Sequence, residues 1–378
     1  MNTKIKIQFF VKVVIILLYF FNNNISLIED VFIHYKKLYN NKKLEYYLQL
    51  CQKGKIKKFK RITHPMISII SPIFNRERFI IRFLRSIQNQ IYNNFEIIIV
   101  DDCSRDNSMK LFEDIQKEDE RIKLIKNKRN KGTFKARNLG VLYAIGKYII
   151  IPDPDDILYK DTIKYCYNLA EKYNYEIINF SFYLGNGLIH FEKFRNKHCN
   201  KLIKQPELST YMYYGNNELQ IIDFNIYNKF IRREVYIKSL NILNNYYLDM
   251  HIIYMEDFIM NYWLFRTAKT MFFSKKVGYY YLRNTISITN NLLKISKIRF
   301  KYIFIYLKIL FEFTKNTKYE KDMANQLFTS LNKAFNILKI SFYAHRKDSN
   351  FYNIIIKLYL NCKLITNENK YLLKKFTL

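Results

Sequence analysis

The chain has 378 residues, of which 63 are Lys or Arg and 32 are Asp or Glu, so its formal net charge is +31. Hydrophobic residues make up 49% of the sequence and aromatic residues 17%, a composition that excludes an intrinsically disordered protein. The basic residues are spread along the whole chain, which indicates a general compositional bias, and no nucleic-acid partner is expected. Cysteines and histidines are scattered and predict no zinc site. Because carboxylates are scarce, each acidic cluster is informative.

The first 21 residues combine a short basic flank with an apolar run. The run extends from residue 7 to residue 21 and is interrupted only by Gln8 and Lys12. As a helix it would reach about 22 Å, which is short of the roughly 30 Å hydrocarbon core of a bilayer. Residues 1–21 are therefore interpreted as a signal peptide or a signal anchor that attaches the chain to a membrane, with a buried helix as the alternative. The secretory pathway (ER or Golgi membrane or lumen) is favoured, with the cytoplasmic face of a membrane as the second option.

The rest of the chain divides into three parts. Residues 22–64 are basic and predict a tether, and a domain of alternating strands and helices begins at Pro65. Unbroken apolar strands between amphipathic helices predict an α/β fold, a doubly wound, mainly parallel sheet with helices on both faces. Residues 291–378 repeat apolar positions at helical spacing and predict a C-terminal helical region. The strands are predicted at 66–71, 95–100, 121–126, 147–152 and 176–184, and the helices at 77–90, 106–117 and 134–146.

Polar residues follow three of the predicted strands. The first strand ends in SPIFNR (71–76), the second in VDDCSRD (100–106) and the fourth in PDPDD (152–156). In an open α/β sheet, ligands bind beyond the carboxyl ends of the strands. Two acidic pairs at one edge would repel each other unless a positive charge lies between them, which favours a divalent cation. The alternative is solvated carboxylates that face the many lysines.

These segments resemble the family 2 glycosyltransferases, which have the GT-A fold. That family has the pattern P-x-[YF]-N followed by V-D-D-x-S-x-D, and then N-x-G, A-R-N-x-G and L-D-x-D-D. Further segments are similar to its W-N-K-L-[FY]-R-R, E-D and Y-Y-Y-R…S-I-T stretches. The resemblance covers about residues 66–290 in family order and predicts a GT-A domain over 65–290 with a mixed sheet. The segments that carry it are residues 71–108, 130–156, 224–236, 254–269 and 277–289.

The resemblance implies roles for five carboxylates. Asp153 and Asp155 form the D-x-D motif, in which Asp155 ligates Mn²⁺ or Mg²⁺ and Asp153 lies near the metal and the donor ribose. A bound cation would neutralise the negative charge of a departing nucleoside diphosphate. Asp156 is expected either to support the metal ligands without contacting the metal or to lie at the start of a helix. Asp257 is expected to deprotonate the acceptor hydroxyl, and its neighbour Glu256 would raise its pKa. The alternative for this pair is a charged helix N-terminus.

Other residues are implied to contact the donor. Asp102 is the expected acceptor for a uracil N–H, Phe74 packs near the base, and Arg137 contacts the nucleotide. The alternatives are core packing for Phe74 and a helix-surface position for Arg137. Cys103 stands where many members carry Gly, and a side chain fits there only if φ is negative. The implied donor contacts are Pro72, Phe74, Asn75, Arg76, Asp101, Asp102, Arg137 and Asp153, with Lys229 and Arg283 as weaker candidates for diphosphate or acceptor contacts.

The resemblance therefore predicts a metal-dependent, inverting hexosyl- or N-acetylhexosaminyltransferase. Its donor would be a nucleotide-sugar, with a UDP-sugar favoured, and its acceptor a hydroxyl group on a glycan, a lipid or a protein. The alternative is a catalytically inactive GT-A-fold protein that binds nucleotide-sugar or glycan. A dinucleotide oxidoreductase is disfavoured because no G-x-G-x-x-G follows the first strand.

Overall fold

The computed structural model describes residues 57–186, 190–194, 200–208, 214–215, 218–219, 225–247 and 256–283. The predictions for the signal segment, for most of the tether and for the helical region 291–378 lie outside the described residues. Within these ranges, no helix combines the length and the apolar character needed to cross a bilayer.

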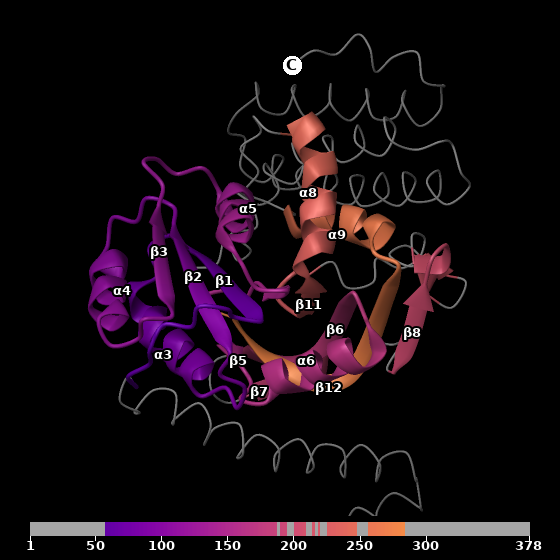
Figure 1. Ribbon diagram of the computed structural model, residues 1–378, viewed down its shortest axis with the longest axis horizontal. Helices are drawn as coiled ribbons and strands as arrows, with labels where there is room; N and C mark the ends of the chain where they lie inside the picture. Colours follow the sequence, from indigo (N-terminus) through magenta and orange to yellow (C-terminus); the bar gives the residue numbers. More distant parts are fainter. Residues whose placement is uncertain are drawn as a thin grey trace, which may run out of the picture.

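The N-terminal half of the domain alternates strands and helices, as predicted (Figure 1). The strands lie in the order β3-β2-β1-β4 and all pair in parallel. Every residue of β1, β2 and β4 is buried, which explains their unbroken apolar sequences. The elements are β1 (Ile67–Ile73), α3 (Glu77–Gln88), β2 (Phe95–Asp101), α4 (Ser108–Gln116), β3 (Ile122–Lys126), α5 (Thr133–Tyr143) and β4 (Tyr148–Ile150).

The C-terminal half extends the same sheet. Beyond β4 the order is β11-β6-β12-β5, with β7 beside β6 and β8 beside β12. Because β11 is antiparallel to both β4 and β6, the sheet is mixed. The strands are β5 (Ile157–Leu158), β6 (Ile177–Asn186), β7 (His190–Phe194), β8 (Lys201–Lys204), β11 (Lys229–Arg232) and β12 (Thr270–Arg283), with a separate pair β9 (Tyr214–Gly215) and β10 (Glu218–Leu219). The helices are α6 (Thr162–Tyr173), α8 (Arg233–Tyr247) and α9 (Glu256–Thr267).

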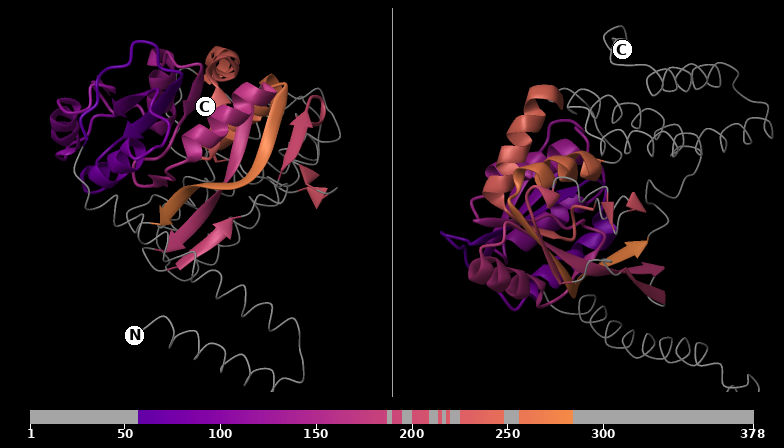
Figure 2. Two further views of the ribbon diagram at one scale, coloured as in Figure 1. Left: turned by 60° about the horizontal axis from the view of Figure 1, so that its bottom comes forward. Right: turned by 90° about the vertical axis from the view of Figure 1, so that its right-hand side faces the viewer.

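Helices cover both faces of the sheet (Figures 1 and 2). Alternate residues of β1 and β2, such as Ile69 and Ile97, join a core cluster with apolar side chains of α3 and α4. The residues between them face α5. A Cβ added at Gly140 of α5 would lie 2.4 Å from Cγ2 of Ile70 and 3.1 Å from Cγ2 of Val100. The glycine therefore lets α5 pack directly on the strands.

The packed region begins before Pro65. The N–H group of Phe59 donates to the carbonyl of Glu118 at 2.9 Å, and the N–H group of Glu120 donates to the carbonyl of Phe59 at 2.9 Å. The ring of Phe59 also covers the buried guanidinium of Arg121, whose carbon lies 3.4 Å from the ring centroid. Phe59, which was expected in the tether, thus packs on the domain.

Candidate active site

The loops after β1 and β2 support each other at one edge of the sheet. The N–H group of Asn75 donates to Oγ of Ser104 at 3.0 Å, and the N–H group of Arg105 donates to Oδ1 of Asn75 at 2.8 Å. Asn75 has a φ of 53°, a left-handed conformation that Asn adopts more readily than most residues. Phe74 is 41% exposed, so it is not a core residue and its ring can meet a ligand. Pro72, by contrast, is a buried residue of β1.

The two aspartates at the end of β2 are buried and bind the polypeptide itself. Asp101 accepts a hydrogen bond from the N–H group of Ser104 at 3.1 Å. The carboxylate of Asp102 accepts from Nδ2 of Asn127 at 2.9 Å and from the N–H groups of Lys131 at 2.8 Å and Gly132 at 2.7 Å. In this structure Asp102 shapes the loop that leads into α5. Its contact with uracil stays a prediction.

Cys103 does not have the negative φ that a side chain was expected to require. Its φ is 69°, in the left-handed region that favours the glycine found in relatives. A non-glycine residue there costs roughly 1–2 kcal/mol. The turn after β2 therefore keeps a glycine-like shape despite the substitution.

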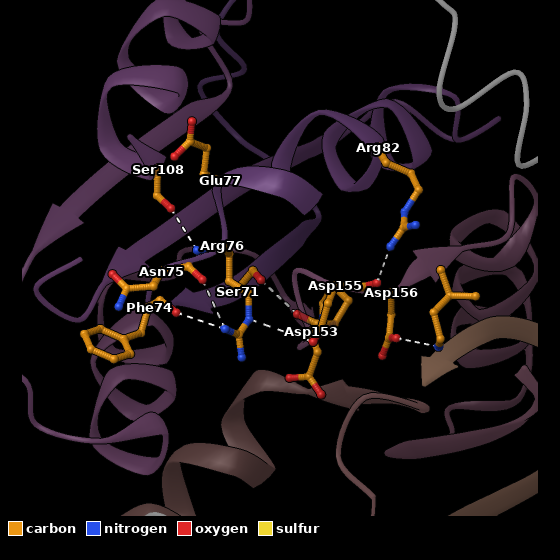
Figure 3. Close-up of polar contacts among 12 residues, drawn as sticks. Ser71, Phe74, Asn75, Arg76, Glu77, Arg82, Ser108, Asp153, Asp155 and Asp156 are labelled. Carbon is orange, nitrogen blue, oxygen red and sulfur yellow. Dashed lines mark hydrogen bonds and ion pairs between the residues drawn. The ribbon is translucent and has the colours of Figure 1, made fainter. Parts of the chain in front are cut away.

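The D-x-D turn follows β4 and lies against α3 (Figure 3). Oδ2 of Asp155 is 3.8 Å from Nε of Arg76, and the carbonyl of Asp155 accepts a hydrogen bond from Nη2 of Arg82 at 2.6 Å. The hydroxyl of Ser71 donates to the carbonyl of Pro152 at 2.9 Å and ties the turn to β1. The carboxylates of Asp153 and Asp155 remain partly exposed, so both can reach a ligand.

Asp156 is a buried anchor and does not start a helix. Residues 157 and 158 form β5, and α6 begins only at Thr162. The carboxylate of Asp156 accepts hydrogen bonds from the hydroxyl of Tyr279 and from the N–H group of Leu282, both at 2.8 Å. Burial raises the pKa of the Asp156 carboxyl well above its usual range, and the nearby charges of Asp155 and Asp153 add to this effect. Local sequence left a supporting role and a helix start as alternatives for Asp156, because its partners on β12 lie more than a hundred residues further along the chain.

Arg137 joins the D-x-D turn to α9. It lies on α5 and is only 5% exposed, so the helix-surface alternative is wrong. Its Nη2 atom is 2.8 Å from Oδ1 of Asp153, while Nη1 is 3.2 Å from Oε1 of Glu256 and also pairs with Oδ1 of Asp257. Burial alone would lower the pKa of Arg137, but the carboxylates of Asp257, Asp153 and Glu256 raise it well above its usual value. The guanidinium is therefore a permanent cation among three carboxylates.

Glu256 and Asp257 occupy the first turn of α9, where a helix favours negative charge. Oδ2 of Asp257 also accepts a hydrogen bond from the N–H group of Ile226 at 3.3 Å. Burial raises the pKa of Glu256 to about 7 and raises the pKa of Asp257 above its usual range, while Arg137 opposes both shifts. A carboxylate that is held in place with a raised pKa has the properties of a general base.

The two weaker candidates differ from the others. Lys229 is fully buried, and its ammonium group donates to Oδ1 of Asn228 at 3.3 Å and to the carbonyl of Asn225. Its positive charge lowers the pKa of Asp257, so Lys229 affects the site through Asp257 while remaining buried. The side chain of Arg283 lies outside the described residues.

Sequence reasoning missed Tyr279, whose hydroxyl accepts a hydrogen bond from the N–H group of Asp153 at 2.9 Å. The only signal for it was its place in the Y-Y-Y-R-like segment.

The donor atoms of the D-x-D turn fit a divalent cation. No group of three or more His, Cys, Asp or Glu side chains placed to hold an ion occurs in the part of the chain that the structure describes. Mg²⁺ is commonly bound by one or two carboxylates, with substrate phosphates and water completing the shell. Asp155 and Asp153 supply that number of partly exposed carboxylates. The residues present therefore suit a cation that arrives together with a diphosphate.

Comparison with known proteins identifies the domain. Residues 68–240 match the family model described as Glycosyl transferase family 2. The domain belongs to this family. EpsJ of Bacillus subtilis, an uncharacterized glycosyltransferase, is 29% identical over 225 residues, which are 60% of this chain and 63% of that protein. WfgD of Escherichia coli, named as a UDP-Glc:α-D-GlcNAc-diphosphoundecaprenol β-1,3-glucosyltransferase, is 36% identical over 126 residues, 30% of this chain and 47% of that protein. The chain thus spans less than two thirds of the length of these curated relatives.

Solved structures confirm the predicted GT-A-type fold. The crystal structure of S. aureus TarS 1–349 has a TM-score of 0.56 and 17% sequence identity, and the match covers 79% of this chain and 80% of that one. The same TarS fragment in complex with UDP-GlcNAc has a TM-score of 0.55 and 16% identity over 78% of this chain and 81% of that one. At this identity the likeness shows the fold and no more.

Proposed function

We propose that this family 2 domain is a metal-dependent, inverting glycosyltransferase that moves a sugar from a UDP-sugar to a hydroxyl acceptor on a glycan, a lipid or a protein. The observation that carries the proposal is the cluster around Arg137, in which the D-x-D residue Asp153 and the candidate base Asp257 contact one guanidinium. The donor end and the acceptor end of a transferase site therefore adjoin. The names of two similar proteins, one a UDP-Glc-dependent glucosyltransferase and one crystallised with UDP-GlcNAc, support the choice of donor.

In this proposal the loops at the strand ends bind the donor. The exposed ring of Phe74 packs on the nucleobase, and Arg76 and Arg137 attract the diphosphate. Asp155, with Asp153, would hold Mn²⁺ or Mg²⁺, which when bound supplies positive charge to the leaving diphosphate. The guanidinium groups of Arg76 and Arg137 already pair with carboxylates. An incoming diphosphate would compete with these carboxylates for the same two guanidinium groups. The site is thus prepared for an anionic ligand before the ligand arrives.

Asp257 performs the proton transfer in this proposal. Its carboxylate accepts the proton of the acceptor hydroxyl while the hydroxyl oxygen forms the bond to the anomeric carbon and the diphosphate leaves. A single displacement of this kind inverts the configuration of that carbon. Arg137 and the N–H group of Ile226 orient the carboxylate, and burial brings its pKa closer to neutral pH.

The test is release of nucleoside diphosphate by the full chain, screened over UDP- and GDP-sugars with Mn²⁺ or with EDTA and a panel of glycan acceptors. We expect release from a UDP-sugar that requires the metal and falls by at least about 100-fold in Asp257→Asn, the usual effect of losing a general base. Asp155→Ala should abolish the metal-dependent release of nucleoside diphosphate. Asp161→Asn is the matched control, because Asp161 pairs with Lys276 away from the cluster and its loss should leave release unchanged.

Two other results would contradict the proposal. Metal-dependent binding of a nucleotide-sugar without release under any condition would favour the inactive binding protein. Unchanged release in Asp257→Asn would remove Asp257 from the role of base and leave the family assignment intact.

A further inference from the structure

The long strand β12 passes directly beside the D-x-D turn. It is the extended orange strand of Figure 2, and its Tyr279 is fully buried. The hydroxyl of Tyr279 accepts a hydrogen bond from the N–H group of Asp153 at 2.9 Å and donates one to Oδ2 of Asp156 at 2.8 Å. A phenolic hydroxyl has one hydrogen to donate, and here both its donor and an acceptor position are used. Its orientation is therefore fixed.

Other hydrogen bonds hold the turn at the carbonyls of Pro152, Asp153 and Asp155, whereas the N–H group of Asp153 is held by Tyr279. Pro152 and Pro154 have no N–H group, so alternate residues of the turn cannot join a hydrogen-bonded ladder. The N–H group of Leu282, three residues beyond Tyr279, donates to the second carboxylate oxygen of Asp156 at 2.8 Å. Strand β12 thus holds the first aspartate of the turn by its backbone and the last by both oxygens of its side chain.

The ring of Tyr279 has a separate packing role. It stacks on the ring of Tyr227, with centroids 4.7 Å apart and an interplanar angle of 14°. Its main chain pairs with Leu158 of β5. Tyr227 follows Ile226, whose N–H group donates to the carboxylate of Asp257. Removal of the hydroxyl would leave these contacts of the ring and main chain in place, so the two roles can be separated by experiment.

We propose that Tyr279 is a positioning residue whose hydroxyl fixes the D-x-D turn in the geometry that binds a divalent cation together with a nucleoside diphosphate. The inference rests on the proposed function and names the part of the chain that holds the metal-binding carboxylates. Removal of a group that hydrogen-bonds to metal ligands and orients them typically weakens metal affinity by 10- to 100-fold. Tyr279 acts through Asp153 and Asp156 and contacts no reacting atom.

The test is binding of UDP to the full chain in the presence of Mn²⁺, measured by titration calorimetry. Tyr279→Phe removes the hydroxyl and keeps the ring, and we expect the Kd of UDP with Mn²⁺ to rise by about 10-fold. Tyr165→Phe is the matched control, because the hydroxyl of Tyr165 makes a 2.8 Å hydrogen bond to Oγ of Ser274 on another part of β12. The control should lose similar stability in thermal unfolding and keep the Kd of the wild type.

The outcomes separate this inference from the proposed function. If the wild type binds UDP with Mn²⁺ and Tyr279→Phe binds equally well, the inference is wrong while the proposed function stands. Equal loss of affinity in Tyr279→Phe and Tyr165→Phe would also overturn it, because the effect would then be general. If the wild type fails to bind UDP with Mn²⁺, the proposed function itself fails. Should Tyr279→Phe not fold, Asp156→Asn replaces the carboxyl that accepts the hydrogen bond of the same hydroxyl, and an unchanged Kd in that variant contradicts the inference.

Discussion

At the scale of single residues, the ionisation of Glu256 and Asp257 decides when the site can work. Three charged groups face this pair from other elements: Arg137 on α5, Asp153 on the D-x-D turn and Lys229 on β11. Burial outweighs the arginine and raises the pKa of both carboxyls, that of Glu256 to about 7. A raised carboxyl pKa means that protons bind at higher pH than usual, so Asp257 loses its function as a base at a higher pH than an ordinary aspartate would.

We therefore expect transfer activity to be constant at alkaline pH and to fall on acidification at a higher pH than an ordinary aspartate would cause, because the pKa of Asp257 is raised. Glu256→Gln removes the negative charge next to the base, so the decline should move to lower pH. The measurement is kcat/KM against pH at saturating Mn²⁺ for the wild type and Glu256→Gln. A wild-type rate that declines only near the ordinary aspartate pKa of about 4 would contradict the raised pKa of Asp257. An identical profile in Glu256→Gln would show that Glu256 does not influence the pKa of the base.

At the scale of secondary structure, α5 carries Arg137 into the cluster, and its position depends on Gly140. A Cβ at Gly140 would overlap Cγ2 of Ile70, so Gly140→Ala must push α5 away from β1. Overpacking of this kind typically costs 1–3 kcal/mol, more than the roughly 1 kcal/mol that alanine gains in helix propensity. Arg137 lies one turn before Gly140, so the displaced helix would also loosen its ion pairs.

We expect Gly140→Ala to lower the free energy of unfolding by up to about 2 kcal/mol, the difference between overpacking and helix propensity. Transfer activity measured well below the unfolding transition should fall as well. Leu142→Ala is the control on the same helix, because Leu142 is 58% exposed and its truncation should change stability by less than about 0.5 kcal/mol. Urea denaturation of both variants provides the measurement. Greater stability in Gly140→Ala would show that the helix has room at this position.

Elements of the N-terminal half could be predicted from sequence because their signals are local. Buried parallel strands give unbroken apolar runs, and the predicted strand 95–100 is found as Phe95–Asp101. For the segment after the D-x-D turn, local sequence left a helix start open as an alternative, for the opposite reason. Residues 157 and 158 pair with Tyr280 and Tyr279, and nothing in the neighbouring sequence shows a partner that far along the chain. A helix start was one of two alternatives for Asp156, and the structure has a short strand there instead.

At the scale of the whole molecule, the main contacts of the candidate site join distant parts of the sequence. Arg137 and Asp257 are 120 residues apart, and each alone allowed an ordinary surface role. The sequence predicted that the acidic residues after the second and fourth strands would repel each other, and a divalent cation was expected to neutralise them. In the structure Arg76 lies beside Asp155 and Arg137 beside Asp153, while Asp101 and Asp102 accept hydrogen bonds from the neighbouring loops. Residue types predicted that opposite charge was needed, but only the fold shows which side chains supply it.

The N-terminal boundary of the domain is also a property of the whole fold. Arg121 is buried and pairs with Oδ2 of Asp119 at 2.8 Å, and its guanidinium lies between the rings of Phe59 and Phe95. A buried ion pair is stable only if its surroundings stay closed to water, and Phe59 closes this one from outside the βα core. The cation–π contact contributes about 0.5–2 kcal/mol, and burial of part of the phenyl ring adds to it.

We therefore expect Phe59→Ala in the full chain to lower the free energy of unfolding of the domain by about 1–3 kcal/mol. Lys58→Ala is the control, because Lys58 is highly exposed and its 3.5 Å contact with Glu118 is a surface ion pair of little energetic value. Urea denaturation of both variants, followed by tyrosine fluorescence, measures the difference. If Phe59→Ala and Lys58→Ala unfold at the same urea concentration, residues 57–61 are an independent tether. A selective loss in Phe59→Ala would show that the folded unit includes Phe59, because Arg121 depends on a ring that the βα core does not supply.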